Sequence, residues 1–415
     1  MVESPTFMAT QTTFGDEILA EAQRLRESGL DANQIAGMLC KKDPQGKNYG
    51  IGILLGANGK PMPSSPTLLE YADRELRESG SGIYLNSDAF KNEIKEAVLR
   101  WQGVPENLWP HIQLLLPSDA GTGAVQVAIQ AAAVLQEGLT TLAVEELGWP
   151  AYKAIAASLR LKYQEFSSDG IAEGTGFIPL YQAGPMNTTG RVPSRDVVKA
   201  RTEAAAKTGK VVVLDRAYSG FEYARRLASG SSYDEIMKES FRAQVLPFAE
   251  AGVPFCAAIS PTKAFVTFSL RPCGFLLVFH PEASKAAALA PKLAALLRAR
   301  GSSFEHLVTR AFVKAIVKDR ARLEAEHAGA LRRCAEAETT WQRCAKGTPI
   351  ETLFSDAYAG LFRNPRARPE AAREIYGAHL YPVFADGRCR LNVTGLPADA
   401  AQAAEQVAFF AEYCF

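Results

Sequence analysis

From about residue 110 onward, short apolar runs alternate along the chain with stretches in which apolar residues recur at helical spacing. The apolar runs have the length of strands and lie at 112–116, 140–144, 159–163, 177–181, 211–214, 254–259 and 275–279. Helical stretches fit between most of them, for example at 125–135, 152–157 and 197–207. This alternation predicts an α/β fold with a mostly parallel seven-stranded sheet that helices cover on both faces. Ligands of such sheets bind beyond the carboxyl ends of the strands.

The segments on either side of this region have a different pattern. Residues 15–40 and 68–78 predict helices, and 50–65 is rich in Gly, Pro and Ser and predicts an extended crossing segment. Residues 285–345 predict one or two long helices, followed by a strand at 390–393 and a helix at 398–413. We therefore expect a large domain over 66–310 and a smaller C-terminal α+β domain over 311–415, with residues 1–65 packing against the smaller domain.

Composition narrows the classes of partner. The chain has 415 residues, of which 47% are apolar, and 46 basic residues balance 45 acidic ones to give a net charge of +1. This balance argues against nucleic acid or an anionic membrane as the main partner. The N-terminus shows no basic-then-apolar signal segment. The chain has no run of about 18 apolar residues that would predict a membrane span. The seven cysteines form no CxxC pair and the five histidines have no metal-ligand spacing, so we expect reduced thiols in a cytoplasmic protein and no metal site.

The candidate chemistry starts at Lys263, in Ser260-Pro261-Thr262-Lys263, directly after the apolar run 254–259. An amine at the exit of a buried strand can form a Schiff base with an aldehyde. Ser260, Thr262 and Arg271, eight residues further on, can hold a phosphate on the same molecule. This combination describes pyridoxal phosphate (PLP). A solvated loop lysine is the alternative interpretation of Lys263.

Other residues favour the same cofactor. Ala120-Gly121-Thr122 precedes a helix, and backbone N–H groups at a helix start can cradle a phosphate, although such a turn can also be only a turn. Asp215 follows the apolar run 211–214, where a carboxylate can stabilise the protonated ring nitrogen of PLP or can cap a helix.

Four further candidates concern the ring and the substrate. Tyr218 and Asn187 can donate hydrogen bonds to the ring's 3-oxygen, or can be an ordinary half-buried tyrosine and a turn asparagine. Trp149 can stack on the pyridine ring or pack in the core. Arg390 can bind a substrate carboxylate bidentately or can be a solvated surface residue.

These pieces occur in an order that resembles a class I aminotransferase of PLP fold type I, in the aspartate and aromatic aminotransferase branch. The resemblance spans about residues 48 to 396. It rests on segments 48–52, 59–61, 82–85, 120–124, 148–150, 187–190, 215–221, 260–263 with Arg271, and 390–396.

The resemblance implies a role for each matching position. Lys263 is the Schiff-base lysine and proton shuttle, Asp215 pairs with the pyridinium nitrogen, and Tyr218 and Asn187 bind the 3-oxygen. The remaining roles are phosphate binding by Ala120, Gly121, Thr122, Ser260, Thr262 and Arg271, ring stacking by Trp149, α-carboxylate binding by Arg390, and closure over the substrate by Ile51 and Gly52. Since this family works as a homodimer with shared sites, Tyr84 is expected to reach the phosphate of the neighbouring subunit.

The chain departs from the family pattern at several positions. Thr188 stands where the family usually has Pro, and Tyr152 stands where aspartate-type members often have His, so a phenol is expected beside Asp215. The stretch from Tyr218 to Lys263 is longer than usual, and we predict a surface insertion there. Arg298 lies near the place of an arginine that binds a distal carboxylate, but the sequence after it does not match, and a solvated arginine is the alternative.

The predicted activity is a ping-pong transamination from an L-amino acid of aspartate or aromatic type to a 2-oxo acid such as 2-oxoglutarate. A β-lyase or decarboxylase on the same fold is the alternative reaction. A PLP-binding regulator is disfavoured because only about 45 residues precede the first family motif, too few for a winged helix-turn-helix.

Overall fold

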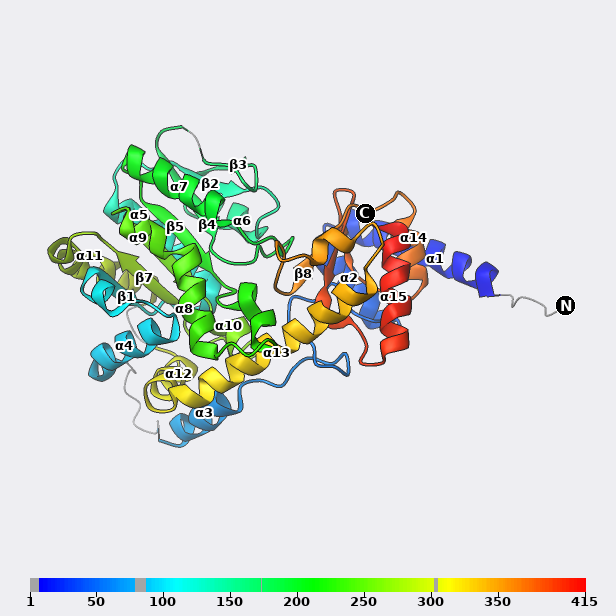
Figure 1. Cartoon of the computed structure of the whole chain (residues 1–415), viewed down its shortest axis with the longest axis horizontal. Coiled ribbons are helices and arrows are strands. Elements are labelled where there is room, and N and C mark those ends of the chain that lie inside the picture. Colours follow the sequence, from blue (N-terminus) through cyan, green and yellow to red (C-terminus); the bar gives the residue numbers. More distant parts are fainter. Residues whose placement is uncertain (1–6, 79–86, 173, 302–304) are drawn as a thin grey trace. The chain divides into compact units, whose positions relative to one another are not determined.

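The structure is a computed structural model that describes residues 7–78, 87–172, 174–301 and 305–415 (Figure 1). The chain divides into two compact units. Unit 1 comprises 1–62, 187–191 and 333–415, and unit 2 comprises 63–186 and 192–332. The last boundary between the units along the chain, at 332/333, therefore falls within helix α13 (Arg320–Cys344), whereas we expected a boundary after residue 310.

Unit 2 is built on a seven-stranded sheet of order β1-β7-β6-β5-β4-β2-β3. Strand β7 is antiparallel to both of its neighbours and the other pairs are parallel, which confirms the predicted mostly parallel sheet. The strands are β1 (Ile112–Leu115), β2 (Thr141–Glu145), β3 (Lys162–Phe166), β4 (Phe177–Gln182), β5 (Val212–Arg216), β6 (Phe255–Ile259) and β7 (Phe275–Phe279).

Each face of this sheet has its own apolar core, because successive side chains of a strand point to opposite faces. On β7, for example, Phe275 and Leu277 belong to one core, and Leu276 and Val278 belong to the other. The first core includes residues of α4 (Lys91–Trp101), α7 (Arg195–Thr208), α8 (Tyr233–Gln244) and α12 (Leu307–Lys318). The second includes residues of α5 (Ala120–Leu135), α6 (Ala151–Ser158) and α11 (Ala283–Gly301). The helices α3 (Pro66–Glu78), α9 (Leu246–Glu250) and α10 (Pro261–Ala264) complete the unit.

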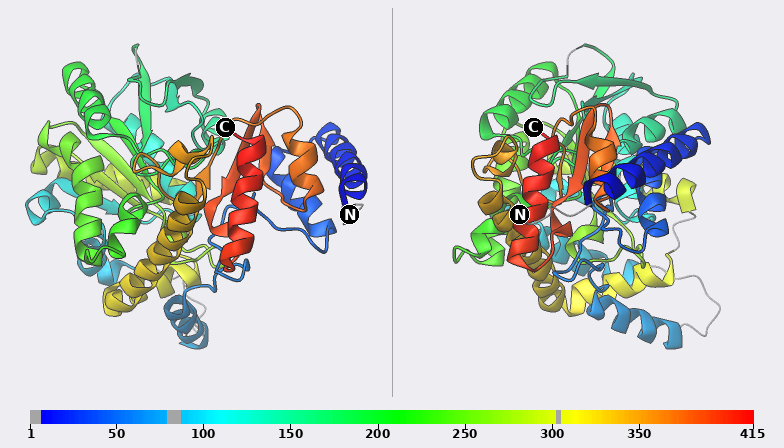
Figure 2. Two further views of the ribbon diagram at one scale, coloured as in Figure 1. Left: turned by 45° about the vertical axis from the view of Figure 1, so that its right-hand side comes forward. Right: turned by 90° about the vertical axis from the view of Figure 1, so that its right-hand side faces the viewer.

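Unit 1 contains a three-stranded antiparallel sheet of order β8-β10-β9. Its strands are β8 (Phe362–Arg363), β9 (Val383–Ala385) and β10 (Arg388–Asn392), and its helices include α1 (Phe7–Glu27), α2 (Ala32–Lys42), α14 (Ala371–Gly377) and α15 (Ala400–Tyr413). Helix α1, dark blue in Figure 2, lies beside the orange α14. Ile35 and Leu39 of α2 share a buried cluster with Tyr376 and Tyr381.

Three of the predicted element boundaries were wrong. The single helix expected at 15–40 is two helices, because Gly29 has φ +90° and Asp31 begins α2 with a capping box. Residues 285–345 lie in three helices of the described chain, α11 to α13, rather than one or two. The strand expected at 159–163 begins at Lys162, because Arg160 has φ 57° after the end of α6.

We predicted a surface insertion in the segment between Tyr218 and Lys263. This segment folds as a short 3₁₀ helix η3 (Phe221–Leu227) followed by α8 and α9. Helix α8 buries Met237, Ser240 and Phe241, so this segment contributes to the core rather than forming only a surface loop.

Candidate active site

Asp215 lies at the carboxyl end of β5, on the face of the sheet that α5 and α6 cover. Its neighbour two positions earlier, Val213, belongs to the core of that face, as does Tyr152 of α6. The phenol of Tyr152 donates a 2.6 Å hydrogen bond to Asp215 Oδ2, and the backbone N–H of Ala217 donates a 3.0 Å bond to Oδ1. The structure thus pairs Asp215 with the tyrosine that the sequence indicated.

Lys263 reaches the same place from the adjacent strand. Strands β5 and β6 are parallel and Arg216 lies opposite Ile259, so the two strands end side by side. Lys263 follows β6 within α10, and its Nζ lies 5.2 Å from the centre of the buried Tyr218 ring. Lys263, Tyr218 and Asp215, which the sequence predicted to act together, therefore lie at one edge of the sheet.

The electrostatics of this edge are set by burial. Burial raises the pKa of the Asp215 carboxyl above its ordinary value, while the Tyr152 hydrogen bond, the Lys263 charge and the Ala217 N–H oppose this effect. Burial and the neighbouring Asp215 raise the pKa of Tyr152 well above its ordinary value, so Tyr152 remains a donor. The buried Asp215 carboxyl group is therefore fixed in position by its two hydrogen bonds and can bind a cationic or N–H partner.

Two of the residues predicted to bind the phosphate, Gly121 and Ser260, lie against each other at the start of α5. Gly121 packs so closely on Ser260 that a Cβ there would lie 2.7 Å from the Ser260 Oγ. Ser260 caps α10 by accepting from the Thr262 N–H at 3.3 Å. Among the described residues, the N-cap Asp119 makes no side-chain capping bond to α5, so the first N–H groups of α5 can face an anion.

The other predicted phosphate residues lie around this turn. Ala120 is buried and forms a β-bridge with Cys273, which brings the segment after Arg271 against the start of α5. Arg271 is exposed with φ 43°, and Thr122 is exposed in the first turn of α5. Trp149 is partly exposed and meets Tyr152 edge-on, with ring centres 5.4 Å apart.

Unit 1 carries the predicted residues Arg390, Asn187, Ile51 and Gly52. The Arg390 guanidinium lies 3.7 Å from the centre of the Phe362 ring. The side-chain amide of Asn392, two residues further along β10, donates to the carbonyl of Ile51 at 2.8 Å. Asn187 begins the loop 187–191, and Gly52 is exposed.

Two predicted residues remain outside this description. Tyr84 lies outside the described residues. Arg298 is exposed in the last turn of α11, where nothing in the structure tests its predicted role. Arg300, which we did not predict, forms a 2.6 Å ion pair with Asp119 at the start of α5. The two arginines point about 200° apart around the helix, so only a choice of helix face could have distinguished them.

Within the part of the chain that the structure describes, His, Cys, Asp and Glu side chains form no group of three or more that could hold a metal ion. No described helix is long and apolar enough to cross a membrane. All seven cysteines are free thiols.

Residues 49–337 match the model of the family described as "Aminotransferase class I and II". The chain belongs to this aminotransferase family. The match covers well over half of the chain and confirms the family that the motifs indicated.

Two curated aminotransferases share a shorter match with this chain. They are histidinol-phosphate aminotransferase 2 of Burkholderia mallei and histidinol-phosphate aminotransferase 1 of Burkholderia pseudomallei. Each is 26% identical over 179 residues. The match covers 41% of this chain. It spans 46% of each relative, which is about half of the relative's length.

Solved aminotransferase structures share the fold over nearly the whole chain. The aromatic-amino-acid aminotransferase of Burkholderia pseudomallei, covalently bound to pyridoxal phosphate, has a TM-score of 0.71 at 18% identity and covers 90% of this chain and 95% of its own. The cytoplasmic aspartate aminotransferase of Giardia lamblia has a TM-score of 0.70 at 19% identity, with coverages of 91% and 96%. These similarities confirm the fold type I architecture.

Proposed function

We propose that this protein is a PLP-dependent aminotransferase that moves an amino group from an L-amino acid to a 2-oxo acid. The observation that carries the proposal is the meeting of the Lys263 amine, the Tyr218 phenol and the buried Asp215 carboxylate at one sheet edge. Membership of the aminotransferase family supports it.

The residues present fit PLP chemically. Asp215 supplies the negative charge that a protonated ring nitrogen needs, and its burial makes an unpaired charge there unfavourable. A Cβ at Gly121 would collide with the Ser260 side chain, so glycine there allows the Ser260 hydroxyl to lie beside the start of α5. The N–H groups of that helix start, which Asp119 does not cap through its side chain, suit a phosphate.

PLP supplies an aldehyde that takes up the amino group and a ring that withdraws electrons from the α-carbon. In our proposal Lys263 holds the cofactor through Nζ and, once displaced, takes up and returns the α-proton on the same atom. Asp215 keeps the proton on the ring nitrogen, and Tyr218 and Asn187 donate to the ring's 3-oxygen. Trp149 stacks on the ring.

Six residues carry the proposed substrate roles, and two of them, Asn187 and Trp149, bind the substrate as well as the cofactor. Arg390 receives the α-carboxylate, for which a guanidinium has the matching two-donor geometry. Ile51 and Gly52 close over the bound amino acid, and Arg298 binds a distal carboxylate if the donor is a dicarboxylate. We propose aspartate or an aromatic amino acid as donor, which the structural likeness to aromatic and aspartate aminotransferases supports.

We further propose a homodimer with shared sites, in which Tyr84 of one subunit reaches the cofactor phosphate of the other. A cytoplasmic location is proposed because all seven cysteines are free thiols.

The proposal is tested by loading the purified protein with PLP and adding single amino acids while the absorbance of the cofactor is followed. Wild type should convert from the aldehyde form to the amine form with its donor, and a 2-oxo acid should restore the starting spectrum. Lys263→Ala should lose the imine absorbance and nearly all turnover, whereas Lys285→Ala, which removes a lysine paired with Glu282 and 62% exposed, should behave as wild type.

Retained activity in Lys263→Ala would contradict the assignment. Release of ammonia or CO₂ without any need for a 2-oxo acid would indicate a lyase or decarboxylase instead.

A further inference from the structure

Arg363, on β8 of unit 1, is a buried arginine that none of the roles above uses. Its side chain is 1% exposed and forms a 2.7 Å ion pair with Glu338 of α13, which is also 1% exposed. Burying two charges is unfavourable unless the geometry and the further hydrogen bonds compensate for the lost water. The Arg363 and Glu338 side chains therefore need further hydrogen-bond partners that offset the cost of their burial.

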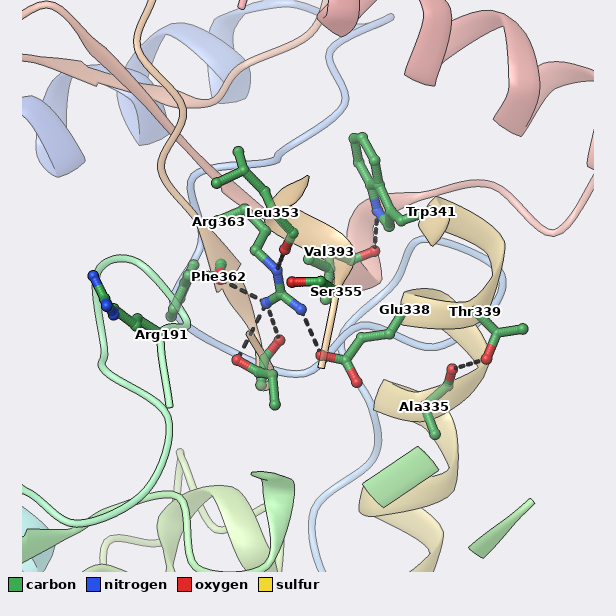
Figure 3. Close-up of polar contacts among 12 residues, drawn as sticks. Arg191, Ala335, Glu338, Thr339, Trp341, Leu353, Ser355, Phe362, Arg363 and Val393 are labelled. Atoms are coloured by element: carbon green, nitrogen blue, oxygen red, sulfur yellow. Dashed lines mark hydrogen bonds and ion pairs between the residues drawn. The ribbon is translucent and has the colours of Figure 1, made fainter. Parts of the chain in front are cut away.

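The guanidinium of Arg363 gathers the loop that precedes it in the chain (Figure 3). Nε donates to the carbonyl of Leu353 at 2.7 Å, at the end of the short 3₁₀ helix η4 (Glu351–Phe354). Nη1 donates hydrogen bonds to three further backbone carbonyls, those of Ala359 at 3.2 Å, Gly360 at 3.1 Å and Phe362 at 2.8 Å. Only the rigid fork of a guanidinium supplies donors in this arrangement.

The loop 187–191, which carries Asn187, is attached to the same centre. The backbone N–H of Ala359 donates to the carbonyl of Gly190 at 2.7 Å, and Arg191 forms a β-bridge with Tyr358. Gly190 has φ +73°, and a Cβ on it would lie 2.2 Å from the Phe362 carbonyl oxygen and 2.6 Å from Arg363 Nη1. This close approach requires glycine and joins the two loops at Arg363.

The residue beside Arg363 lies against the proposed substrate arginine. Phe362 stands opposite Asn392 in the antiparallel β8-β10 pair, and Arg390 is two residues before Asn392. Arg390 and Phe362 therefore lie diagonally on one face of the sheet, where the guanidinium is 3.7 Å from the ring centre. Arg390 Nη1 also donates to the side chain of Asn33 at 2.8 Å.

We propose that Arg363, held by Glu338, is a positioning residue for recognition of the substrate α-carboxylate. By binding the Phe362 carbonyl and the loop on which Gly190 rests, it fixes the ring against Arg390 and the loop that presents Asn187. The inference rests on the proposed function, in which Arg390 binds the carboxylate. A role in stability alone is the competing explanation.

The test compares Arg363→Lys with wild type, because lysine retains the charge opposite Glu338 but loses the planar fork. The amino acid that converts the PLP form best and its α-carboxamide are each titrated in the spectral half-reaction. The amino-acid concentration that gives half-saturation should rise about tenfold, which corresponds to the loss of roughly one charge-assisted hydrogen bond. The limiting rate of the half-reaction should change little. Half-saturation by the carboxamide should change little.

Two further variants separate positioning from stability. Arg201→Lys alters a comparably buried pair in unit 2, with Glu145 at 2.7 Å and side chains 2% and 1% exposed, and should lower the urea midpoint without raising half-saturation. In an Arg390→Lys background, Arg363→Lys should add little, because the group that it positions has already been changed.

Hydrogen exchange of the cofactor-free protein provides a readout that does not depend on turnover. Arg363→Lys should speed exchange in peptides covering 187–191 and 353–363, and Arg201→Lys should not. Unchanged half-saturation in Arg363→Lys, or an equal increase in the Arg390→Lys background, overturns the inference while the function stands. Absence of any conversion by wild type overturns the proposed function and the inference together.

Discussion

At the scale of single residues, the hydrogen bond between Tyr152 and Asp215 fixes the carboxyl group on which the proposed cofactor binding depends. It is 2.6 Å long and both side chains are buried. A carboxylate in such surroundings is stable only when its oxygens are satisfied, and the phenol satisfies one of them permanently. Tyr152 therefore prepares Asp215 for the proposed cationic partner.

We predict that Tyr152→Phe weakens PLP binding. Removing the phenol takes away a hydrogen bond to a charged group, worth about 1.5 to 3 kcal/mol, which corresponds to a loss of affinity of about tenfold or more. Titration of the cofactor-free protein with PLP measures it. Tyr163→Phe removes a similar bond on β3, from the partly buried Tyr163 to the exposed Glu165 at 2.8 Å, and serves as the control. Equal affinities of the two variants would refute the prediction.

A second residue-scale prediction concerns His327, which is fully buried and accepts a 2.8 Å hydrogen bond from Tyr233. Burial lowers the pKa of His327 from 6.5 to about 3. Between these values the unfolded chain binds a proton that the native protein does not, so native stability falls as the pH falls through this window. At pH 5 the loss should be about 2 kcal/mol relative to neutral pH.

Urea unfolding at pH 7 and pH 5 measures this loss. His327→Gln keeps an acceptor for Tyr233 but has no titrating ring, so its unfolding free energy should fall less between the two pH values than that of wild type. His306→Gln, at an exposed position, should retain the dependence of wild type. A wild-type slope in His327→Gln would show that other groups cause it.

In the large unit, the placement of Asp215 and Lys263 could be predicted from the sequence, because each lies at or shortly after the carboxyl end of an apolar strand. Parallel strands bring their carboxyl ends to one edge. The Arg363–Glu338 pair could not be predicted. Charged residues are ordinarily exposed, and nothing local in the sequence distinguishes two that become partners across 25 positions.

At the scale of elements, helix α8 connects the chain segment around Tyr218, which follows β5, to the core. Ser240 of α8 accepts hydrogen bonds from Arg216 Nη2 at 3.1 Å and from the Gly220 N–H at 3.2 Å, and donates to Glu222 Oε1 at 2.5 Å. Arg216 is the last residue of β5, and Gly220 and Glu222 follow Tyr218 closely in the chain. The helix thus contributes to the placement of Tyr218.

We predict that Ser240→Ala lowers the free energy of unfolding by about 1 to 3 kcal/mol, because it leaves buried polar partners unpaired. It should also weaken PLP binding, since the Tyr218 loop loses its anchor. Ser232→Ala, which removes the N-cap of the same helix, should cost about 1 kcal/mol and leave PLP binding unchanged. Urea unfolding and PLP titration of both variants measure the difference, and matching affinities would contradict the anchoring role.

The same helix marks the limit of element prediction. Buried strands are recognised because every residue is apolar, as in β7, whose five residues are all buried. The buried face of α8 includes the polar residues Glu239, Ser240 and Gln244, so no continuous apolar pattern identifies it as a core helix. The break between α1 and α2 was missed because the apolar spacing continues across Gly29, whose positive φ ends the helix.

At the scale of the whole molecule, the proposed dimer with shared sites can be tested by subunit mixing. A hybrid of a Lys263→Ala subunit and a Tyr84→Ala subunit has one site in which both residues are intact. Mixing the two inactive or weakened homodimers under exchange conditions should therefore restore activity. If the sites are not shared, the mixture gives only the average of the two parents, and a mass near 44.9 kDa in solution would exclude the dimer.

The uncapped start of α5 also matters for handling the protein. Its amides favour any tetrahedral oxyanion, and sulfate or orthophosphate in a purification buffer has the same shape and charge as the cofactor's phosphate. We expect occupation by such an ion to raise the apparent melting temperature and to slow reconstitution with PLP, so that a preparation is more resistant to heat while it takes up the cofactor less readily. Chloride-based, sulfate-free media are therefore the appropriate reference state for every affinity proposed above.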